Sequence, residues 1–590
     1  MWCELKEKTT LWNFDFLFFK RFAKLIPFYF GNPCSLIIFM FLIVVALGEQ
    51  YVVYNVGIIT SEYYKVLGEK DLNGFWTHSI KSLAIIICVS LIISTKDYLI
   101  SVLYVIWRQL LTQHLQKEYM HSNNYYKLNV LDKAIDNPDQ RITQDIDKMC
   151  NKLSTNIAVV IVSPFTICYY SYVLFVTTGW WGPTGVFGFF LLSTLINKLL
   201  MSPVVNYVFM QEQCEGFFRF KHMHIRTNAE SIAFQDGSFN ELTQLSEKFA
   251  KLVKVQQNLF ARQFPLSLSV KLFAYLGSIF SFLLLAVPLF NGKYDSLSVA
   301  DLSALISKNT FVTMYLINCF TQLVNLSTDV TVIAGTTHRI SEFLEWIKIN
   351  NTFEAVKENQ FSQIETDHQS GEKTIMEIDN VTYSTPGEND LLISQLSYSF
   401  EKAKNTLITG DSGCGKTSLL RIIKGLWPIS EGQIRWDVLT SSTDIFYLPQ
   451  KPLLTDGCLR QQIVYPLDCS LITTSNDETI IRYLKIADLI HILQRAGGLD
   501  EYVDWNWCDI LSPGEMQRLS FVRLFYHKPV IAFLDEATSA IGQEMEETLF
   551  KFCKFLDITL CTVGHRKSLI SYHNYQINFK SKGRYDIKEL

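Results

Sequence analysis

Residues 406–427, TLITGDSGCGKTSLLRIIKGLW, carry the strongest structural signal in the chain. An apolar run (TLIT) leads into Gly410–Thr417, which matches the pattern G-x-x-x-x-G-K-[ST], and a helical pattern follows. In such a strand–loop–helix unit the backbone N–H groups curl around phosphate oxygens, and the positive end of the helix dipole adds attraction. The stretch therefore predicts a nucleoside triphosphate site on an α/β domain.

Two residues of this loop have specific expected roles. Lys416 is predicted to reach the β- and γ-phosphates, and the hydroxyl of Thr417 is predicted to bind Mg²⁺. The residues predicted to contact the nucleotide from this loop are Gly410, Asp411, Ser412, Gly413, Cys414, Gly415, Lys416, Thr417 and Ser418.

A second apolar run, Val530–Leu534, ends in the acidic pair Asp535-Glu536. A carboxylate at the tip of a buried parallel strand can hold Mg²⁺, which suits Asp535. Glu536 is then placed to orient or deprotonate the attacking water. Together with the phosphate loop, this pair predicts an ATP-hydrolysing site.

The remainder of the chain has a membrane protein's composition. Of 590 residues, 48% are hydrophobic and 19% are charged, which excludes a disordered chain and argues against an ordinary soluble enzyme. The net charge of −4 gives no general attraction to nucleic acid, and none is expected as a partner. The thirteen cysteines include no C-x-x-C pair, so neither a zinc module nor a disulfide scaffold is predicted.

Long apolar runs lie almost entirely before residue 325, and each is long enough to cross a bilayer as a helix of about 20 residues. The six predicted spans are Ser35–Ile58, Ser82–Val105, Asn156–Thr177, Thr184–Phe209, Leu266–Phe290 and Val299–Val324. Six buried helices of a soluble protein are the alternative, but soluble cores rarely repeat such runs with so few charges. Charged residues inside the runs are expected to face the bundle interior, and Lys198 is a candidate cargo contact.

Lysine and arginine are concentrated before the first span and in the connections between spans two and three and spans four and five. The positive-inside rule places these segments, and both termini, in the cytosol. The two connections are predicted to continue the spans as helices, with bends at Asp136–Gln144 and Glu230–Phe234. The predicted organisation is a cytosolic N-terminal segment (1–34), a six-span domain with two cytosolic coupling loops (35–345), a linker (346–373) and a nucleotide-binding domain (374–590).

Further motifs point to a family. Residues 511–518, LSPGEMQR, resemble the LSGGQ signature of ATP-binding cassette (ABC) proteins. Gln450 matches the family's Q-loop glutamine, at the Mg²⁺ and transmembrane interface, and His565 matches its switch histidine, which contacts the γ-phosphate. The resemblance implies that both act in catalysis with Glu536, and that Gln450 binds Mg²⁺ together with Thr417 and Asp535. The resemblance implies an α-helical membrane domain of six long transmembrane helices, with the exporter-like (type IV) fold, followed by an α/β P-loop ATP-binding cassette.

In that family two cassettes pair head to tail, so that the signature of one faces the phosphate loop of the other. The chain resembles a half-transporter that acts as a dimer, most simply with a second copy of itself. Ser512, Gly514 and Glu515 are then expected at the partner's ATP. Pro513 and Glu515 depart from the signature, and Gly542 stands where the family has an aspartate. The residue that stacks on adenine is open between Tyr383 in that role and Tyr383 as an ordinary strand residue.

Four stretches resemble subfamily D half-transporters: residues 125–146, 228–234, 334–340 and 504–526. Residues 211–226 and 306–323 resemble its lysosomal cobalamin (vitamin B12) transporters in particular. This implies a multi-pass lysosomal membrane protein that moves a small-molecule cargo, cobalamin, from lumen to cytosol. It also implies a separate polytopic lysosomal partner and passage through the endoplasmic reticulum.

Two alternatives stay open. A peroxisomal transporter of long-chain fatty acyl-CoA would have the same fold, but its cargo would favour more basic residues along the spans than Lys198 and Lys271. A non-transporting ATP-driven membrane regulator is the second alternative, and the complete set of catalytic motifs argues against it.

Overall fold

The computed structural model describes residues 16–132, 135–361, 374–386, 390–436, 444–467, 477–580 and 583–590. The chain divides into two compact units. The first contains the described residues up to Leu128 and those from residue 135 to Val356. The second contains Asn129–Asp132 together with the described residues from Lys357 onward.

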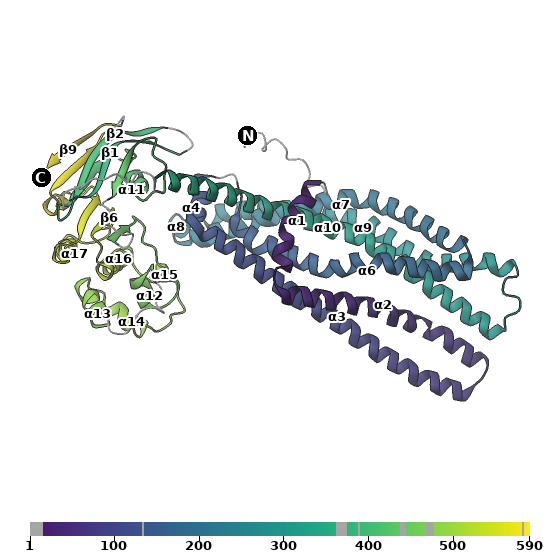
Figure 1. Ribbon diagram of the computed structural model, residues 1–590. Helices are drawn as coiled ribbons and strands as arrows, with labels where there is room; N and C mark the ends of the chain where they lie inside the picture. The colour runs from purple at the N-terminus through teal and green to yellow at the C-terminus, as the bar shows by residue number, and fades with distance from the viewer. Residues whose placement is uncertain are drawn as a thin grey trace. The chain divides into compact units, whose positions relative to one another are not determined.

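The first unit consists of long helices joined by short turns (Figure 1). The long helices are α1 (Phe16–Phe30), α2 (Pro33–Gly68), α3 (Leu72–Met120), α6 (Ile146–Thr178), α7 (Trp181–Thr227), α9 (Ser238–Phe290) and α10 (Val299–Phe361). The short ones are α4 (Asn124–Tyr126), α5 (Pro138–Gln140) and α8 (Ala229–Phe234). A short helix lies at each predicted bend, since α5 falls within Asp136–Gln144 and α8 covers Glu230–Phe234.

Among the described residues, five helical segments are long and apolar enough to cross a membrane. They are Pro33–Gly68, Leu72–Leu131, Pro138–Thr178, Trp181–Thr227 and Ser238–Phe290, and they contain the first five predicted spans. The sixth predicted span lies in α10, which does not belong to this group. Polar residues interrupt its apolar run, and two of them, Asn309 and Thr313, are buried. The count of six is therefore not confirmed.

Charged residues within the predicted spans pair where two helices meet. Lys96 on α3 donates to both carboxylate oxygens of Glu49 on α2, at 2.7 Å each. Lys65, on α2 beyond the end of the first predicted span, lies 2.9 Å from Asp301 on α10. Pairing keeps the cost of charge in an apolar environment low, so these contacts fix α2 against its neighbours. Lys198 and Lys271, by contrast, are exposed on the single chain.

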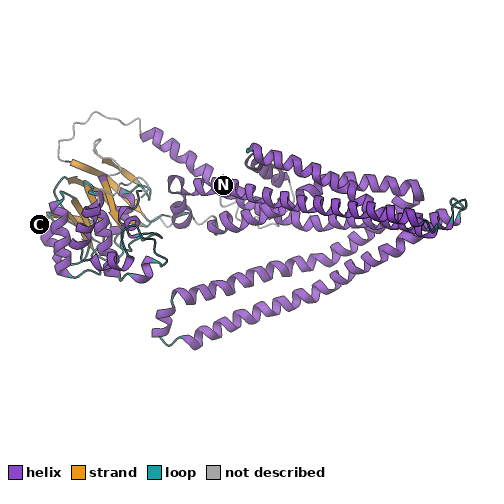
Figure 2. Cartoon of the chain, turned by 90° about the horizontal axis from the view of Figure 1, so that it is seen from below, coloured by secondary structure: helices purple, strands orange, loops and turns teal. Residues whose placement is uncertain are grey.

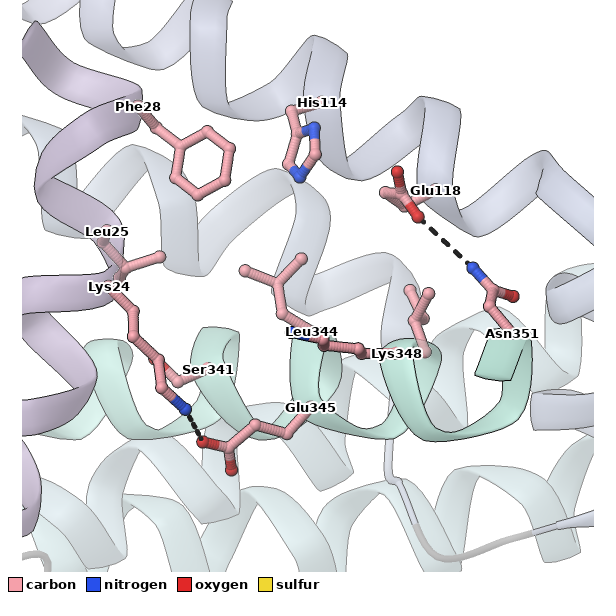
Figure 3. Close-up of a pocket in the computed structure, with 11 residues that line it drawn as sticks. Lys24, Leu25, Phe28, His114, Glu118, Ser341, Leu344, Glu345, Lys348 and Asn351 are labelled. Atoms are coloured by element: carbon pink, nitrogen blue, oxygen red, sulfur yellow. Dashed lines mark hydrogen bonds and ion pairs between the residues drawn. The ribbon is translucent and has the colours of Figure 1, made fainter. Parts of the chain in front are cut away.

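The N-terminal helix α1 crosses the long helices of the bundle (Figure 1). Its buried Tyr29 packs against Trp107 of α3, with ring centroids 5.2 Å apart. Figure 3 shows a pocket between α1, α3 and α10. Its volume is about 670 Å³. Across it Lys24 donates to Glu345 at 3.0 Å. The packing and this ion pair tether α1 to the rest of the unit.

Helices α7 and α9 pack on each other to form a hairpin with α8 at its tip. Cys214 on α7 is buried against Leu252 and Val255 on α9. Figure 2 shows the α8 end of this hairpin standing away from the other long helices, whereas its opposite end packs on α6 and α10. Large apolar side chains along it, including Phe220 and Phe264, are exposed on the single chain.

The second unit carries two sheets. One has the strand order β2–β1–β4, with antiparallel pairing, and the other has the order β5–β6–β7–β3–β8–β9, parallel except at β9. The strands are β1 (Thr374–Ser384), β2 (Leu391–Glu401), β3 (Thr406–Gly410), β4 (Glu431–Trp436), β5 (Ile445–Leu448), β6 (Ile531–Asp535), β7 (Thr559–Val563), β8 (Tyr575–Phe579) and β9 (Tyr585–Glu589).

Helices cover the second sheet and complete the cores on its two faces. They are α11 (Lys416–Ile423), α12 (Leu459–Val464), α13 (Asp477–Ile486), α14 (Ile490–Ala496), α15 (Trp507–Ile510), α16 (Pro513–His527) and α17 (Gln543–Phe555). Parallel strands β3, β6 and β7 lie side by side, so their carboxyl ends meet at one edge. That edge carries the phosphate loop after β3, the acidic pair after β6 and His565 after β7.

The segment predicted as a linker begins as helix. Because α10 continues to Phe361, residues 346–361 are helical. Trp346 and Ile347 are buried in the core of the first unit, which explains why the helix extends past the predicted boundary. Residues 362–373 lie outside the described part of the chain.

Candidate nucleotide site

The phosphate loop joins β3 to α11, as the sequence predicts. Gly410 has a φ of 144°, and a Cβ there would lie 2.3 Å from the carbonyl oxygen of Phe579, so no other residue fits. Gly413 has a φ of 80°. Asp411, Ser412 and Gly413 are exposed, so their backbone is accessible to a phosphate chain.

Lys416 bonds the backbone of the phosphate loop from its inner side. Its Nζ donates to the carbonyl oxygens of Gly410, at 2.9 Å, and Asp411, at 2.7 Å. The ammonium is therefore held inside the curve of the loop, where phosphate oxygens would compete for it. Cys414 is half-buried, with its Sγ 3.9 Å from this nitrogen, and Ser418 is buried in the first turn of α11.

Tyr383 lies beneath the loop. Its side chain is fully buried, and its hydroxyl donates to the carbonyl oxygen of Gly415 at 3.2 Å. A ring enclosed in the core has no free face for an adenine, so the structure favours the strand-residue interpretation. Tyr383 supports the loop by packing and by this hydrogen bond.

The two residues predicted to bind Mg²⁺ at the end of β6 and the start of α11 are in contact. Thr417 Oγ1 donates to Asp535 Oδ1 at 3.1 Å. Burial raises the pKa of the Asp535 carboxyl, and the Thr417 hydrogen bond opposes that rise. A hydroxyl and a carboxylate are hard oxygen donors of the kind that Mg²⁺ prefers, so this pair fits the ion.

The predicted catalytic residues converge on Glu536. Gln450 Nε2, after β5, donates to Glu536 Oε2 at 2.8 Å, and His565 Nε2, after β7, lies 3.7 Å from Glu536 Oε1. The backbone of Glu536 is left-handed, with a φ of 48°, and its N–H donates to the carbonyl oxygen of Val563. Strain of this kind is found at functional sites, and here it turns the carboxylate toward the two partners.

The signature segment begins α16 with a closed hydrogen-bond box. Ser512 Oγ accepts from the backbone N–H of Glu515 at 3.3 Å, while Glu515 Oε2 accepts from the Ser512 backbone N–H at 2.8 Å. Glu515 Oε1 also lies 2.7 Å from His491 Nε2. Burial alone would raise the pKa of the Glu515 carboxyl, but His491 and the two Ser512 donors lower it to about 2.

Glu515 is therefore engaged with its own helix start in the single chain, and its contact with the partner's ATP stays a prediction. Sequence reasoning missed His491, because the contact joins residues from α14 and α16 that no local pattern relates. The box itself could have been found, since Ser512 and Glu515 have the S-x-x-E spacing of a capping box.

The predicted site residues that the structure describes fall into two groups. The loop residues, Asp535, Glu536, Gln450 and His565 gather at one edge of the sheet, whereas the described contacts join neither Ser512 nor Gly514 to that group. An arrangement with the signature away from its own phosphate loop is what a head-to-tail pair of cassettes requires.

Comparisons with known proteins match both units. Residues 25–290 match the family described as ABC transporter transmembrane region 2, and residues 393–539 match the family described as ABC transporter. The chain is 42% identical to the mouse protein named lysosomal cobalamin transporter ABCD4, covering 98% of this chain and 97% of that one. The human protein of the same name is 41% identical over the same shares.

More distant relatives belong to the same subfamily. ATP-binding cassette sub-family D member 3 of the rat is 33% identical over 85% of this chain and 78% of its own length. Identity at this level covers most of the chain, in which a membrane region is followed by one cassette. The chain therefore belongs to the ABC transporter family, as an ATP-hydrolysing half-transporter of subfamily D.

Proposed function

We propose that this half-transporter acts as a homodimer and moves cobalamin from the lysosomal lumen to the cytosol. The observation that carries the proposal is the 42% and 41% identity, over nearly the whole chain, to two proteins named lysosomal cobalamin transporter. Relatives named as member 3 of the subfamily reach at most 33% and cover less of the chain. Similarity that includes the membrane half supports a shared cargo.

The proposed membrane architecture is exporter-like, with α10 as the sixth span and both termini in the cytosol. Its buried Asn309 and Thr313 suit a helix that turns polar residues to the bundle and apolar ones to lipid. The bends at α5 and α8 are proposed to be the coupling segments that pass cassette movements to the spans. Buried Arg141 supports this for α5, since it bonds Asp136 at 2.7 Å and Glu342 of α10 at 2.8 Å.

In the proposed hydrolytic step, Lys416 and the loop amides bind the phosphates and Glu536 takes the proton from water. Gln450 and His565 hold the Glu536 carboxylate in position from its two sides. Thr417 and Asp535 would hold Mg²⁺, which neutralises phosphate charge when bound. Ser512 and the Gly514 amide donate to the ATP held by the other chain, and Glu515 orients Ser512.

ATP binding closes the two cassettes, the coupling segments follow, and the cavity between the spans changes side. Hydrolysis through Glu536 reopens the pair. In cells, a separate polytopic lysosomal protein is proposed to bring the dimer to its membrane from the endoplasmic reticulum. This part rests on the resemblance to the subfamily's cobalamin branch.

The deciding experiment measures the movement of labelled cobalamin in proteoliposomes with ATP on the cassette side. We expect accumulation on the cassette side, and none with Glu536→Gln. Glu431→Gln is the matched control, because Glu431 is an exposed glutamate on β4, in the sheet that does not carry the catalytic residues. Lack of cobalamin movement by a chain that hydrolyses ATP would contradict the proposed cargo.

The same proteoliposomes separate the alternatives. Movement of a labelled long-chain acyl-CoA in place of cobalamin would establish the alternative cargo, and imaging of the tagged chain would then place it on peroxisomes. ATP hydrolysis that neither cargo stimulates, with no movement of either, would favour a membrane regulator.

A further inference from the structure

The turn Ser539–Ile541 begins three residues after Glu536 and contacts several functional segments. The Arg566 side chain forms two hydrogen bonds to the turn. Its Nη2 donates to the carbonyl oxygen of Ser539 and its Nη1 to that of Ile541, each at 2.7 Å. Gln517 of α16 holds it from another side, donating to Ser539 Oγ at 2.9 Å and accepting from the Ala540 N–H at 2.8 Å. The turn is thus fixed at each of its residues by side chains of the same chain.

We call Arg566 and Gln517 the clamp of this turn, and the buried Glu546 supports the Arg566 side of it. Arg566 Nη1 lies 3.3 Å from Glu546 Oε2, and Ser568 Oγ donates to Glu546 Oε1 at 2.6 Å. Glu546 is completely buried, as is most of Gln517. A planar guanidinium that bonds two carbonyls and a buried carboxylate has little freedom to reorient.

The clamp connects the parts of the ATP site. Arg566 is the residue after His565, Gln517 lies one turn after Gly514 on α16, and the turn begins three residues after Glu536. The start of α16 also touches the turn, since a Cβ on Gly514 would lie 2.9 Å from the carbonyl oxygen of Ala540. The contacts of this turn therefore lead to Glu536, His565 and Gly514, so its position bears on where all three lie.

We propose that Arg566 and Gln517 are positioning residues for ATP hydrolysis. They hold the Ser539–Ile541 turn so that Glu536, His565 and the signature keep their relative positions, although Gly542 offers no side chain to do so. This inference rests on the proposed role of Glu536 in hydrolysis. The clamp does not touch Gly410–Thr417, so its loss should slow turnover while ATP binding persists.

The test uses the full-length chain in proteoliposomes and compares kcat and KM for ATP. Removing Arg566 alone would leave the buried Glu546 unpaired, so Arg566→Ala is combined with Glu546→Gln and measured against Glu546→Gln. We expect kcat to fall about ten- to a hundredfold, because sub-ångström misplacement of reacting groups has costs of this order, with KM within about twofold. Arg566→Lys in the same background should restore kcat only in part, because one ammonium cannot bond both carbonyl oxygens as the guanidinium does.

Gln517→Leu provides an independent variant with no change of charge, and it too should lower kcat with KM kept. Arg435→Ala is the matched control, since Arg435 is an exposed arginine on β4 that pairs with Asp379. Unchanged kcat in the Arg566 and Gln517 variants would overturn the proposal, as would equal losses of ATP affinity and turnover. If Glu536→Gln instead kept full ATPase activity, the assignment of the base would fail while the clamp result stood.

Discussion

At the scale of single residues, Glu536 is the position at which hydrolysis can be separated from binding. Its carboxylate accepts a hydrogen bond from Gln450, and no described contact joins it to the phosphate loop. Glu536→Gln keeps the size of the side chain but cannot take a proton. We expect ATPase activity to fall about a hundredfold or more while bound ATP accumulates, measured by phosphate release and by retention of labelled nucleotide. Normal activity in this variant would contradict its role.

Lys416 differs from Glu536 because it also shapes the loop. Its ammonium bonds the carbonyls of Gly410 and Asp411, and a nucleotide would draw it to the phosphates. Lys416→Ala removes both interactions. We expect loss of ATP binding together with turnover, measured by titration with a fluorescent ATP analogue. Binding at the wild-type affinity would show that the lysine does not reach the phosphates.

Glu515 makes stability depend on acidity. Its pKa in the folded chain is about 2, below the usual value of about 4.3 for an unfolded glutamate. At a pH between these two values, the Glu515 carboxylate therefore stays charged in the folded chain but is protonated in the unfolded chain. The resulting stabilisation is complete above about pH 4.3 and declines as the pH falls toward 2. In Glu515→Gln the thermal midpoint should fall less between pH 6 and pH 3 than in the wild type, and an identical fall would contradict the assignment.

Among elements, α2 and α3 depend on a charge pair within the predicted spans. Lys96→Met leaves the Glu49 carboxylate buried without its partner, and we expect a loss of about 3 kcal/mol in the free energy of unfolding. The double variant Lys96→Met with Glu49→Gln removes both charges and should recover most of that loss. Denaturant titration in detergent measures all three chains. A single variant as stable as the wild type would mean that the pair contributes nothing.

The elements also show how far sequence reasoning extends. The strands and helix around the phosphate loop could be predicted because motif and local periodicity coincide there. The sixth predicted span is not confirmed, because polar residues interrupt its apolar run in α10 and two of them, Asn309 and Thr313, are buried. The Arg566 clamp and the His491 contact join distant segments, and no periodicity or spacing relates their residues.

For the whole molecule, the separation of the signature from its own phosphate loop predicts coupled sites in a dimer. When wild-type chains are mixed with an equal amount of Glu536→Gln chains, random pairing leaves about a quarter of the dimers fully wild type. If both sites must work, transport should fall to about that quarter; if each works alone, it should fall only to about half. ATP-driven movement of the proposed cargo, cobalamin, to the cassette side of mixed proteoliposomes distinguishes these outcomes.

The length of α10 has a mechanical consequence. A straight helix of 63 residues is about 95 Å long, so a tilt of about 5° at one end carries the other through about 8 Å. The helix thus behaves as a lever arm, in which small angular adjustments among packed side chains become large displacements at a distant end. Movement on that scale then needs no hinge within α10, because a stiff helix transmits a tilt along its whole length.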